Sequence, residues 1–234
     1  MRSQEDWEKW YAQPNPWGTE GSDKDRVRTE ILLDRLRHAS FSYTLDIGCG
    51  EGAMTNVVSA LSRRTLAIDI SSRAIERARS RFPGIDFRQG ELLEVITRPD
   101  IRAIPFDLIL ASEVLYYLQT DEERLAAIAG IARLGAPACV YYFSVIVTGA
   151  SKHRRYFTHD EFVRLLSAHF NIIDGFASVA EIPTALDLFL RLVPFRRTRK
   201  RILKAWTTSR ETADSRHMGY LAVKRRADLQ PSAR

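Results

Sequence analysis

The chain has 234 residues, of which 45% are hydrophobic and 27% are charged. This composition is typical of one globular domain with a sizeable core and excludes a chain that is disordered throughout. The longest strongly apolar run spans residues 138–147, roughly half of the ~20 residues that a membrane helix needs. The polar start of the chain has no signal-peptide core. We therefore expect a cytoplasmic protein without a transmembrane segment.

The net charge of +6 comes from one segment, residues 188–210, which holds eight basic residues and no acidic one. These are Arg191, Arg196, Arg197, Arg199, Lys200, Arg201, Lys204 and Arg210. The ordinary interpretation of such a run is a solvated helix face. The alternative is an anionic substrate or an anionic surface such as a phospholipid membrane. Nucleic acid is a less favoured partner because the run is short and contains few aromatic residues.

Predicted strands and helices alternate along the chain. A helix capped by Ser22 or Asp23 is expected first, with an apolar face that includes Val27 and Ile31. Strands are predicted at 43–47, 65–70, 85–88, 106–112 and 138–147, and helices between them at 53–62, 71–81 and 121–133. Two further strands are predicted at 170–176 and 219–224. This order is typical of a mostly parallel sheet with helices on both faces.

The domain organisation follows from these elements. Residues 1–22 form an N-terminal segment rich in aromatic residues, which either folds onto the core or closes as a lid. Residues 23–226 form the main domain, with an insert at about 177–217 that contains the basic run. Residues 227–234 are predicted to be a disordered tail. The two cysteines, Cys49 and Cys139, have no zinc-site spacing, so we expect buried thiols and no metal site.

A glycine-rich loop, with Gly48, Cys49 and Gly50, connects the first strand to the first helix. Glycines permit a tight turn with backbone close to a ligand, and the helix start favours an anionic group. Asp69 ends the second strand 21 residues after Gly48, at the position where an acid accepts hydrogen bonds from ribose hydroxyls. Both NAD and S-adenosylmethionine fit this pattern.

The charge of the loop separates the two cofactors. Asp46 and Glu51 flank it, and the phosphates of a dinucleotide would be repelled by roughly 3–4 kcal/mol for charges ~4–6 Å apart at an effective dielectric constant of ~20. S-adenosylmethionine has no phosphate, and its ammonium and sulfonium groups are attracted to carboxylates. The sequence therefore favours S-adenosylmethionine.

The segment 45–52, together with Asp69, Gly90-Glu91 and the strand order, resembles class I S-adenosylmethionine-dependent methyltransferases over residues 40–175. The stretch 112–118 and the tripeptide 15–17 are further similar to the rhizobial nodulation N-methyltransferases, which modify a chito-oligosaccharide amine. The resemblance implies an α/β fold: a Rossmann-like seven-stranded, mostly parallel sheet with helices on both faces and an antiparallel last strand.

The resemblance also implies a set of cofactor residues. Asp46 and the loop would hold the methionine portion, Asp69 the ribose, and Ile70 and Glu91 the adenine, where the family usually has aspartate in place of Glu91. The full predicted cofactor site is Asp46, Gly48, Cys49, Gly50, Asp69, Ile70, Glu91, Leu92 and Ser112.

The candidate catalytic residues, Glu113, Tyr116 and Tyr117, follow the fourth strand, where ligands of such sheets bind. The alternative is that both tyrosines merely begin a packed helix, and of the two we expect Tyr117 to point away. Trp17 and His153 are the candidate substrate residues. The predicted function is methyl transfer to nitrogen or oxygen of a small molecule, such as a saccharide or secondary metabolite. The alternatives are an RNA or protein methyltransferase that docks through the basic insert, and a non-catalytic cofactor-binding scaffold.

Overall fold

The computed structural model describes residues 3–18, 21–147, 156–179, 183–209 and 217–225. His153, Arg210 and the predicted tail at 227–234 lie outside the described residues.

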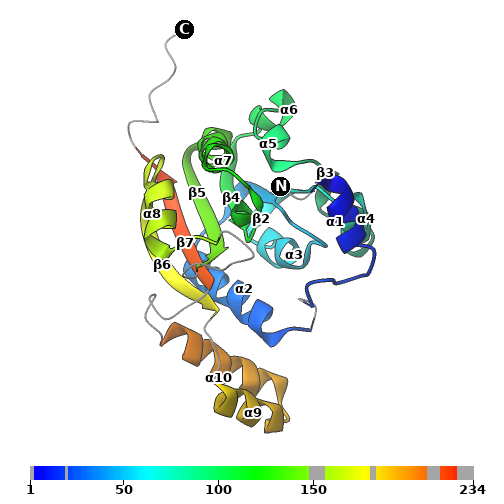
Figure 1. Cartoon of the computed structure of the whole chain (residues 1–234), viewed down its shortest axis with the longest axis vertical. Helices are drawn as coiled ribbons and strands as arrows, with labels where there is room; N and C mark the ends of the chain where they lie inside the picture. The colour runs from blue at the N-terminus through cyan, green and yellow to red at the C-terminus, as the bar shows by residue number, and fades with distance from the viewer. Residues whose placement is uncertain (1–2, 19–20, 148–155, 180–182, 210–216, 226–234) are drawn as a thin grey trace.

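In the described part of the chain, seven strands form one sheet in the order β3-β2-β1-β4-β5-β7-β6 (Figure 1). β7 runs antiparallel to both of its neighbours, and every other pairing is parallel. The predicted fold class, including the antiparallel last strand, is confirmed. The strands are β1 (Phe41–Ile47), β2 (Ser62–Asp69), β3 (Asp86–Gln89), β4 (Phe106–Ser112), β5 (Gly135–Ile146), β6 (Phe170–Val179) and β7 (His217–Lys224).

Helices cover both faces of the sheet, because the central strands are apolar on both sides. In β4, Ile109 belongs to the hydrophobic cluster under α7 and α8, whereas Leu108 and Leu110 belong to the cluster under α2, α3 and α10. No helix in the described ranges could cross a membrane. The helices are α1 (Gln4–Trp10), α2 (Asp23–Leu36), α3 (Ala53–Ser59), α4 (Ser72–Arg81), α5 (Leu92–Val95), α6 (Pro99–Arg102), η1 (Leu115–Tyr117), α7 (Asp121–Leu134), α8 (His159–Ser167), α9 (Thr184–Leu192) and α10 (Arg196–Thr208).

The helix starts follow from side-chain caps that the sequence contains. The side chain of Ser22 accepts a hydrogen bond from the Asp25 backbone N–H and begins α2, as predicted. Helix α7 begins at Asp121, the first residue of the predicted range, and Thr120 is its N-cap. Thr120 and Glu123 form a reciprocal capping box there.

The basic insert folds back on the domain through α10, which packs on α2 and β6. Arg196 and Arg199 pair with Asp23 at 2.9 and 3.3 Å. Lys200 and Lys204 pair with Glu30 and Asp34 of α2. The interpretation of the whole basic run as a solvated face is therefore wrong for these four residues, whose charges hold α10 to an acidic face of α2.

Candidate active site

The glycine-rich loop between β1 and α3 has a backbone that only glycine adopts easily. Gly48 and Gly50 have φ angles of +77° and +54°, in the left-handed region. A Cβ atom at Gly48 would lie 3.0 Å from Val114 Cγ2, and one at Gly50 would lie 3.0 Å from the Tyr11 hydroxyl. Any larger residue at these two positions would therefore crowd Val114 or Tyr11 and strain the backbone of the loop.

Two buried carboxylates stand beside this loop. Asp46 at the end of β1 accepts a hydrogen bond from the Thr55 hydroxyl at 2.6 Å. Asp69 at the end of β2 accepts hydrogen bonds from the Gly50 N–H at 2.8 Å and the Ser71 N–H at 3.0 Å. Burial raises the pKa of Asp46 and of Asp69 to about 6. Each oxygen still has capacity to accept from a ligand hydroxyl or ammonium.

These raised pKa values predict that affinity for S-adenosylhomocysteine is pH-dependent. Asp46 and Asp69 can accept hydrogen bonds from the ligand through both oxygens only when they are ionised. The affinity should therefore be highest above the pKa of about 6. Below it, the Kd should rise roughly tenfold per pH unit for each carboxylate that must lose its proton. Calorimetric titrations between about pH 5 and pH 8 measure this, and a Kd that stays constant across the range would contradict it.

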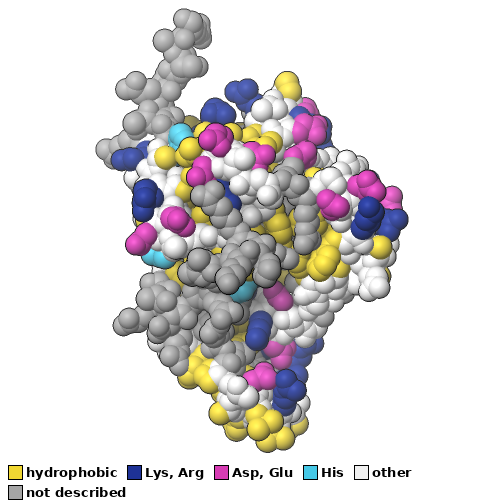
Figure 2. Space-filling view, in the orientation of Figure 1, with side chains coloured by type: hydrophobic (Ala, Val, Ile, Leu, Met, Phe, Trp, Pro, Cys, Tyr) yellow, Lys and Arg dark blue, Asp and Glu magenta, His cyan; other side chains and the backbone are white. Residues whose placement is uncertain are grey.

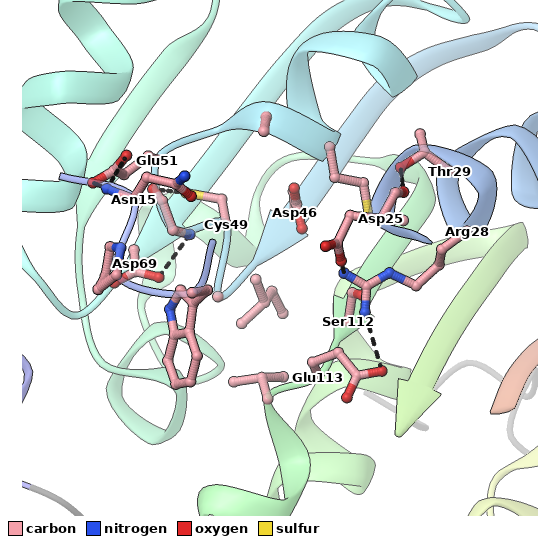
Figure 3. Close-up of a pocket in the computed structure, with 18 of the residues that line it drawn as sticks. Asn15, Asp25, Arg28, Thr29, Asp46, Cys49, Glu51, Asp69, Ser112 and Glu113 are labelled. Carbon is pink, nitrogen blue, oxygen red and sulfur yellow. Dashed lines mark hydrogen bonds and ion pairs between the residues drawn. The ribbon is translucent and has the colours of Figure 1, made fainter. Parts of the chain in front are cut away.

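The loop opens into a cavity of about 930 Å³, within the usual range of roughly 300–1,000 Å³ for small-molecule sites. Figure 3 shows Asp46 between two groups of residues, with Cys49 and Asp69 on one side and Ser112 and Glu113 on the other. The cavity is lined by all the predicted cofactor residues: Asp46, Gly48, Cys49, Gly50, Asp69, Ile70, Glu91, Leu92 and Ser112. Cys49, predicted to be buried, is only half-buried because it lines this cavity.

The N-terminal segment is docked beside the loop, next to α4 (Figure 1). Glu8 of α1 accepts hydrogen bonds from the Ser71 hydroxyl at 3.0 Å and the Ser72 N–H at 2.6 Å, which places its charge at the start of α4. Glu51 accepts from the Asn15 N–H at 3.1 Å and pairs with Arg77 at 2.7 Å. The carboxylate of Glu51 thus anchors this segment. The preference of the loop for a positively charged ligand over a phosphate-bearing one therefore depends on Asp46 and Asp69.

Aromatic side chains of the segment form one wall of the cavity. Trp7 is buried and its ring meets the ring of Tyr117 edge-on, with centroids 4.8 Å apart. Trp17 is 38% exposed, lines the cavity and donates a hydrogen bond to the Tyr11 hydroxyl at 3.0 Å. The segment therefore folds onto the core and lines the cavity.

Glu113 lies in the cavity across Asp46 from Cys49 and Asp69 (Figure 3). Its backbone has a φ of +58°, which turns the chain sharply after β4. Its Oε1 accepts from the Ser144 hydroxyl at 2.9 Å and lies 3.4 Å from His217 Nδ1 and 3.5 Å from Arg28 Nη1. Burial alone would raise the pKa of Glu113, but His217 and Arg28 outweigh it, so the pKa is lowered. Glu113 is therefore a carboxylate at neutral pH.

The two tyrosines of η1 both line the cavity. Burial and the neighbouring charge of Glu113 raise the pKa of Tyr116 far above its ordinary value, so Tyr116 is a hydrogen-bond donor and not a base. Tyr117 contacts Trp7 and Trp17. The expectation that Tyr117 points away is wrong, because Leu115–Tyr117 form a single 3₁₀ turn instead of an α-helix.

The ionisable residues of the cavity that were not predicted from the sequence include Asp25, Arg28, Glu30, Lys200 and His217. The first three belong to α2, where charged residues next to an apolar face suggested a solvated surface. Arg28 instead points inward and pairs with Asp25 at 2.7 Å (Figure 3). Its side chain is only 14% exposed. No local pattern signals this, since the main neighbours of α2 are α10 and β6, which lie far along the chain.

A family model described as nodulation protein S matches residues 3–177, about three quarters of the chain. The chain belongs to the nodulation protein S family. This confirms the predicted resemblance to class I S-adenosylmethionine-dependent methyltransferases. The family assignment supports the predicted enzyme class and the predicted cofactor.

Curated relatives include nodulation protein S of Rhizobium tropici, 30% identical over 131 residues that cover 54% of this chain and 52% of the relative. Nodulation protein S of Bradyrhizobium diazoefficiens is 31% identical over 134 residues, which cover 56% of this chain and 62% of the relative. The chain therefore aligns with about half to three fifths of the length of these relatives.

Solved structures share the fold over nearly the whole chain. The N-methyltransferase NodS from Bradyrhizobium japonicum WM9, in complex with S-adenosylhomocysteine, superposes with a TM-score of 0.70 at 20% identity and covers 94% of this chain and 97% of its own. The 1,6-didemethyltoxoflavin-N1-methyltransferase of Burkholderia thailandensis gives 0.63 at 20% identity, with 94% and 86% covered. At these identities the likeness establishes the fold.

Proposed function

We propose that this protein transfers the methyl group of S-adenosylmethionine to the amine nitrogen of a small acceptor, with an amino sugar as the best-supported class. The observation that carries the proposal is Glu113, whose Oε2 is buried and has no hydrogen-bond partner among the described residues. Leaving a buried carboxylate oxygen unpaired is costly. An amine of the acceptor would supply the missing donor.

The residues around the loop fit the cofactor. Asp69 would accept from the ribose hydroxyls and Asp46 from the ammonium of the methionine portion. Ile70 and Leu92 would enclose the adenine beside Glu91, all three lining the same cavity. When bound, the cofactor supplies an electrophilic methyl group on a sulfonium.

The acceptor end provides the residues for the nitrogen. As the N–C bond forms, the C–S bond breaks, its electron pair stays on sulfur, and the nitrogen becomes positively charged. The carboxylate of Glu113 would stabilise that charge and accept the proton that the nitrogen loses. The oxygen of the Tyr116 hydroxyl would accept a hydrogen bond from an N–H of the amine, which leaves the nitrogen lone pair free and aims it at the methyl group. Placing the nucleophile in line in this way can lower a barrier by up to ~7–11 kcal/mol.

The alternatives have weaker support. Docking of RNA through the basic insert requires free cations, whereas four of the basic residues of α10 pair with α2. A non-catalytic scaffold would have no need of a buried, ionised carboxylate at the acceptor end of the cavity. The aromatic rings of Trp17 and Tyr117, whose centroids are 6.3 Å apart in the lining of the same cavity, suit the apolar face of a sugar ring.

The proposal is tested with matched acceptors and labelled S-adenosylmethionine. A glucosamine oligomer with a free amine should receive methyl groups, whereas the same oligomer fully N-acetylated should not. Methyl incorporation at equal rates into both would show that oxygen is the acceptor atom. No incorporation into any amine, with the cofactor bound tightly, would favour the scaffold.

We further predict that Trp17→Ala raises the KM for the acceptor roughly tenfold, the scale of a lost stacking contact. Cofactor affinity should change little. Trp17→Phe is the matched control, since it keeps an aromatic ring and loses only the hydrogen bond to the Tyr11 hydroxyl. Steady-state kinetics and a cofactor titration measure both effects. Wild-type KM in Trp17→Ala would show that the acceptor does not touch this wall.

A further inference from the structure

Helix α9 is apolar on two opposite sides. One side carries Leu190, which is buried at 8% exposure. The other side carries Leu188, Phe189 and Leu192. With Phe195, which lies just before α10, they form a group that we call the outer stripe, and their exposed fractions are 62%, 53%, 76% and 70% in chain order. Only one side of a surface helix is needed to pack on a domain. The outer stripe therefore has no role in the packing of the described chain.

The outer stripe is concentrated at one place on the molecule. It contributes four of the nine large hydrophobic side chains that are exposed among the described residues, and all four lie within eight positions. Figure 2 shows hydrophobic side chains gathered at the end of the molecule formed by α9. A contiguous exposed apolar patch of this kind marks a surface that binds another protein or a membrane.

The surroundings of the outer stripe are strongly basic. Between Thr184 and Thr208 there are seven basic residues and one acidic residue. Four of the basic residues pair with α2. Arg197 and Arg201, one turn apart on α10, are exposed and have no acidic partner in the described part of the chain. The charge that remains at this end of the molecule is therefore positive.

We propose that the insert, through the outer stripe together with Arg197 and Arg201, docks on the surface of a membrane that contains anionic phospholipid. In such a membrane, the leucine and phenylalanine side chains can insert into the apolar acyl-chain region, and the arginines can pair with negatively charged headgroups. A second copy of the chain would cover the apolar stripe but would bring two basic surfaces together. Helix α9 has nine residues, so it lies in the membrane surface and does not span the bilayer.

The docking face also adjoins the cavity. Lys200 of α10 lines the cavity and pairs with Glu30 of α2, while Arg197 and Arg201 of the same helix point outward. In a molecule held by its insert, α10 would thus contact both the membrane and the cavity. The proposal concerns the location of the protein and stands whatever the acceptor.

The experiment is flotation of the full chain with phosphatidylcholine vesicles that contain or lack phosphatidylglycerol. The wild type should float with the anionic vesicles at low salt and only weakly with neutral ones. The variant Leu188→Ser/Leu192→Ser/Phe195→Ser should lose flotation on both. Arg197→Gln/Arg201→Gln should lower the partition coefficient for anionic vesicles roughly thirtyfold, an effect that high salt should erase by screening.

Two control variants are matched in chemistry and placed elsewhere. Leu125→Ser removes an exposed leucine of α7, and Arg63→Gln/Arg64→Gln removes two exposed arginines of β2. Both should float like the wild type. Absence of wild-type flotation, or equal flotation of the stripe variant, would overturn the proposal. A wild-type dimer that the stripe variant abolishes in sedimentation would assign the stripe to a second copy instead.

Discussion

Glu113→Gln is expected to lower kcat at least about a hundredfold, the lower range for loss of a group that accepts a proton and stabilises charge in the transition state. Glutamine keeps the size of the side chain and removes the negative charge that His217 and Arg28 maintain. Cofactor affinity should remain close to that of the wild type, because Glu113 lies across Asp46 from Cys49 and Asp69. Single-turnover kinetics with the amine acceptor and a separate cofactor titration measure the two quantities.

The variant should fold, since Arg28 keeps Asp25 as a partner at 2.7 Å. Glu76→Gln, an exposed residue of α4, makes the same chemical change outside the cavity and should have wild-type kinetics. Glu113→Asp retains the charge on a shorter side chain and should recover part of the lost rate. Wild-type turnover in Glu113→Gln would exclude Glu113 from the chemistry, even if the acceptor is an amine.

Asp69→Ala is expected to weaken S-adenosylhomocysteine binding by at least about 2 kcal/mol, roughly thirtyfold, the scale of hydrogen bonds to a charged group. The loss has two physical origins. The ribose loses its acceptor, and the Gly50 N–H loses the carboxylate that fixes the loop at 2.8 Å. Calorimetry on the wild type and the variant measures the change.

Asp86→Ala, an exposed position of β3, is the matched control and should leave the affinity unchanged. Asp69→Asn should fall between the two, because it keeps an acceptor oxygen but not the charge. Thermal unfolding of the apo variants shows whether Asp69→Ala disturbs the fold beyond the loop. Unchanged affinity in Asp69→Ala, or binding of NAD in place of S-adenosylhomocysteine by the wild type, would contradict the assignment.

The sequence by itself determined the sheet, its longer helices and the residues that gather around the glycine-rich loop. These depend on local patterns: apolar runs that form strands, caps such as Ser22, and glycines at positive φ followed by an acid one strand later. Such features act within a few residues or between adjacent parallel strands, so their spacing is enough to place Asp46, Gly48 and Asp69 together.

Only the tertiary structure decided the acceptor end and the role of the basic insert. Arg28 and His217 are 189 positions apart and reach Glu113 from α2 and β7. The basic residues of α10 meet acids of α2 that lie about 170 positions earlier. No local pattern records which surfaces meet, because charged residues on an isolated helix favour solvent until a partner of opposite charge is packed against them. That pairing leaves α9 and its outer stripe exposed.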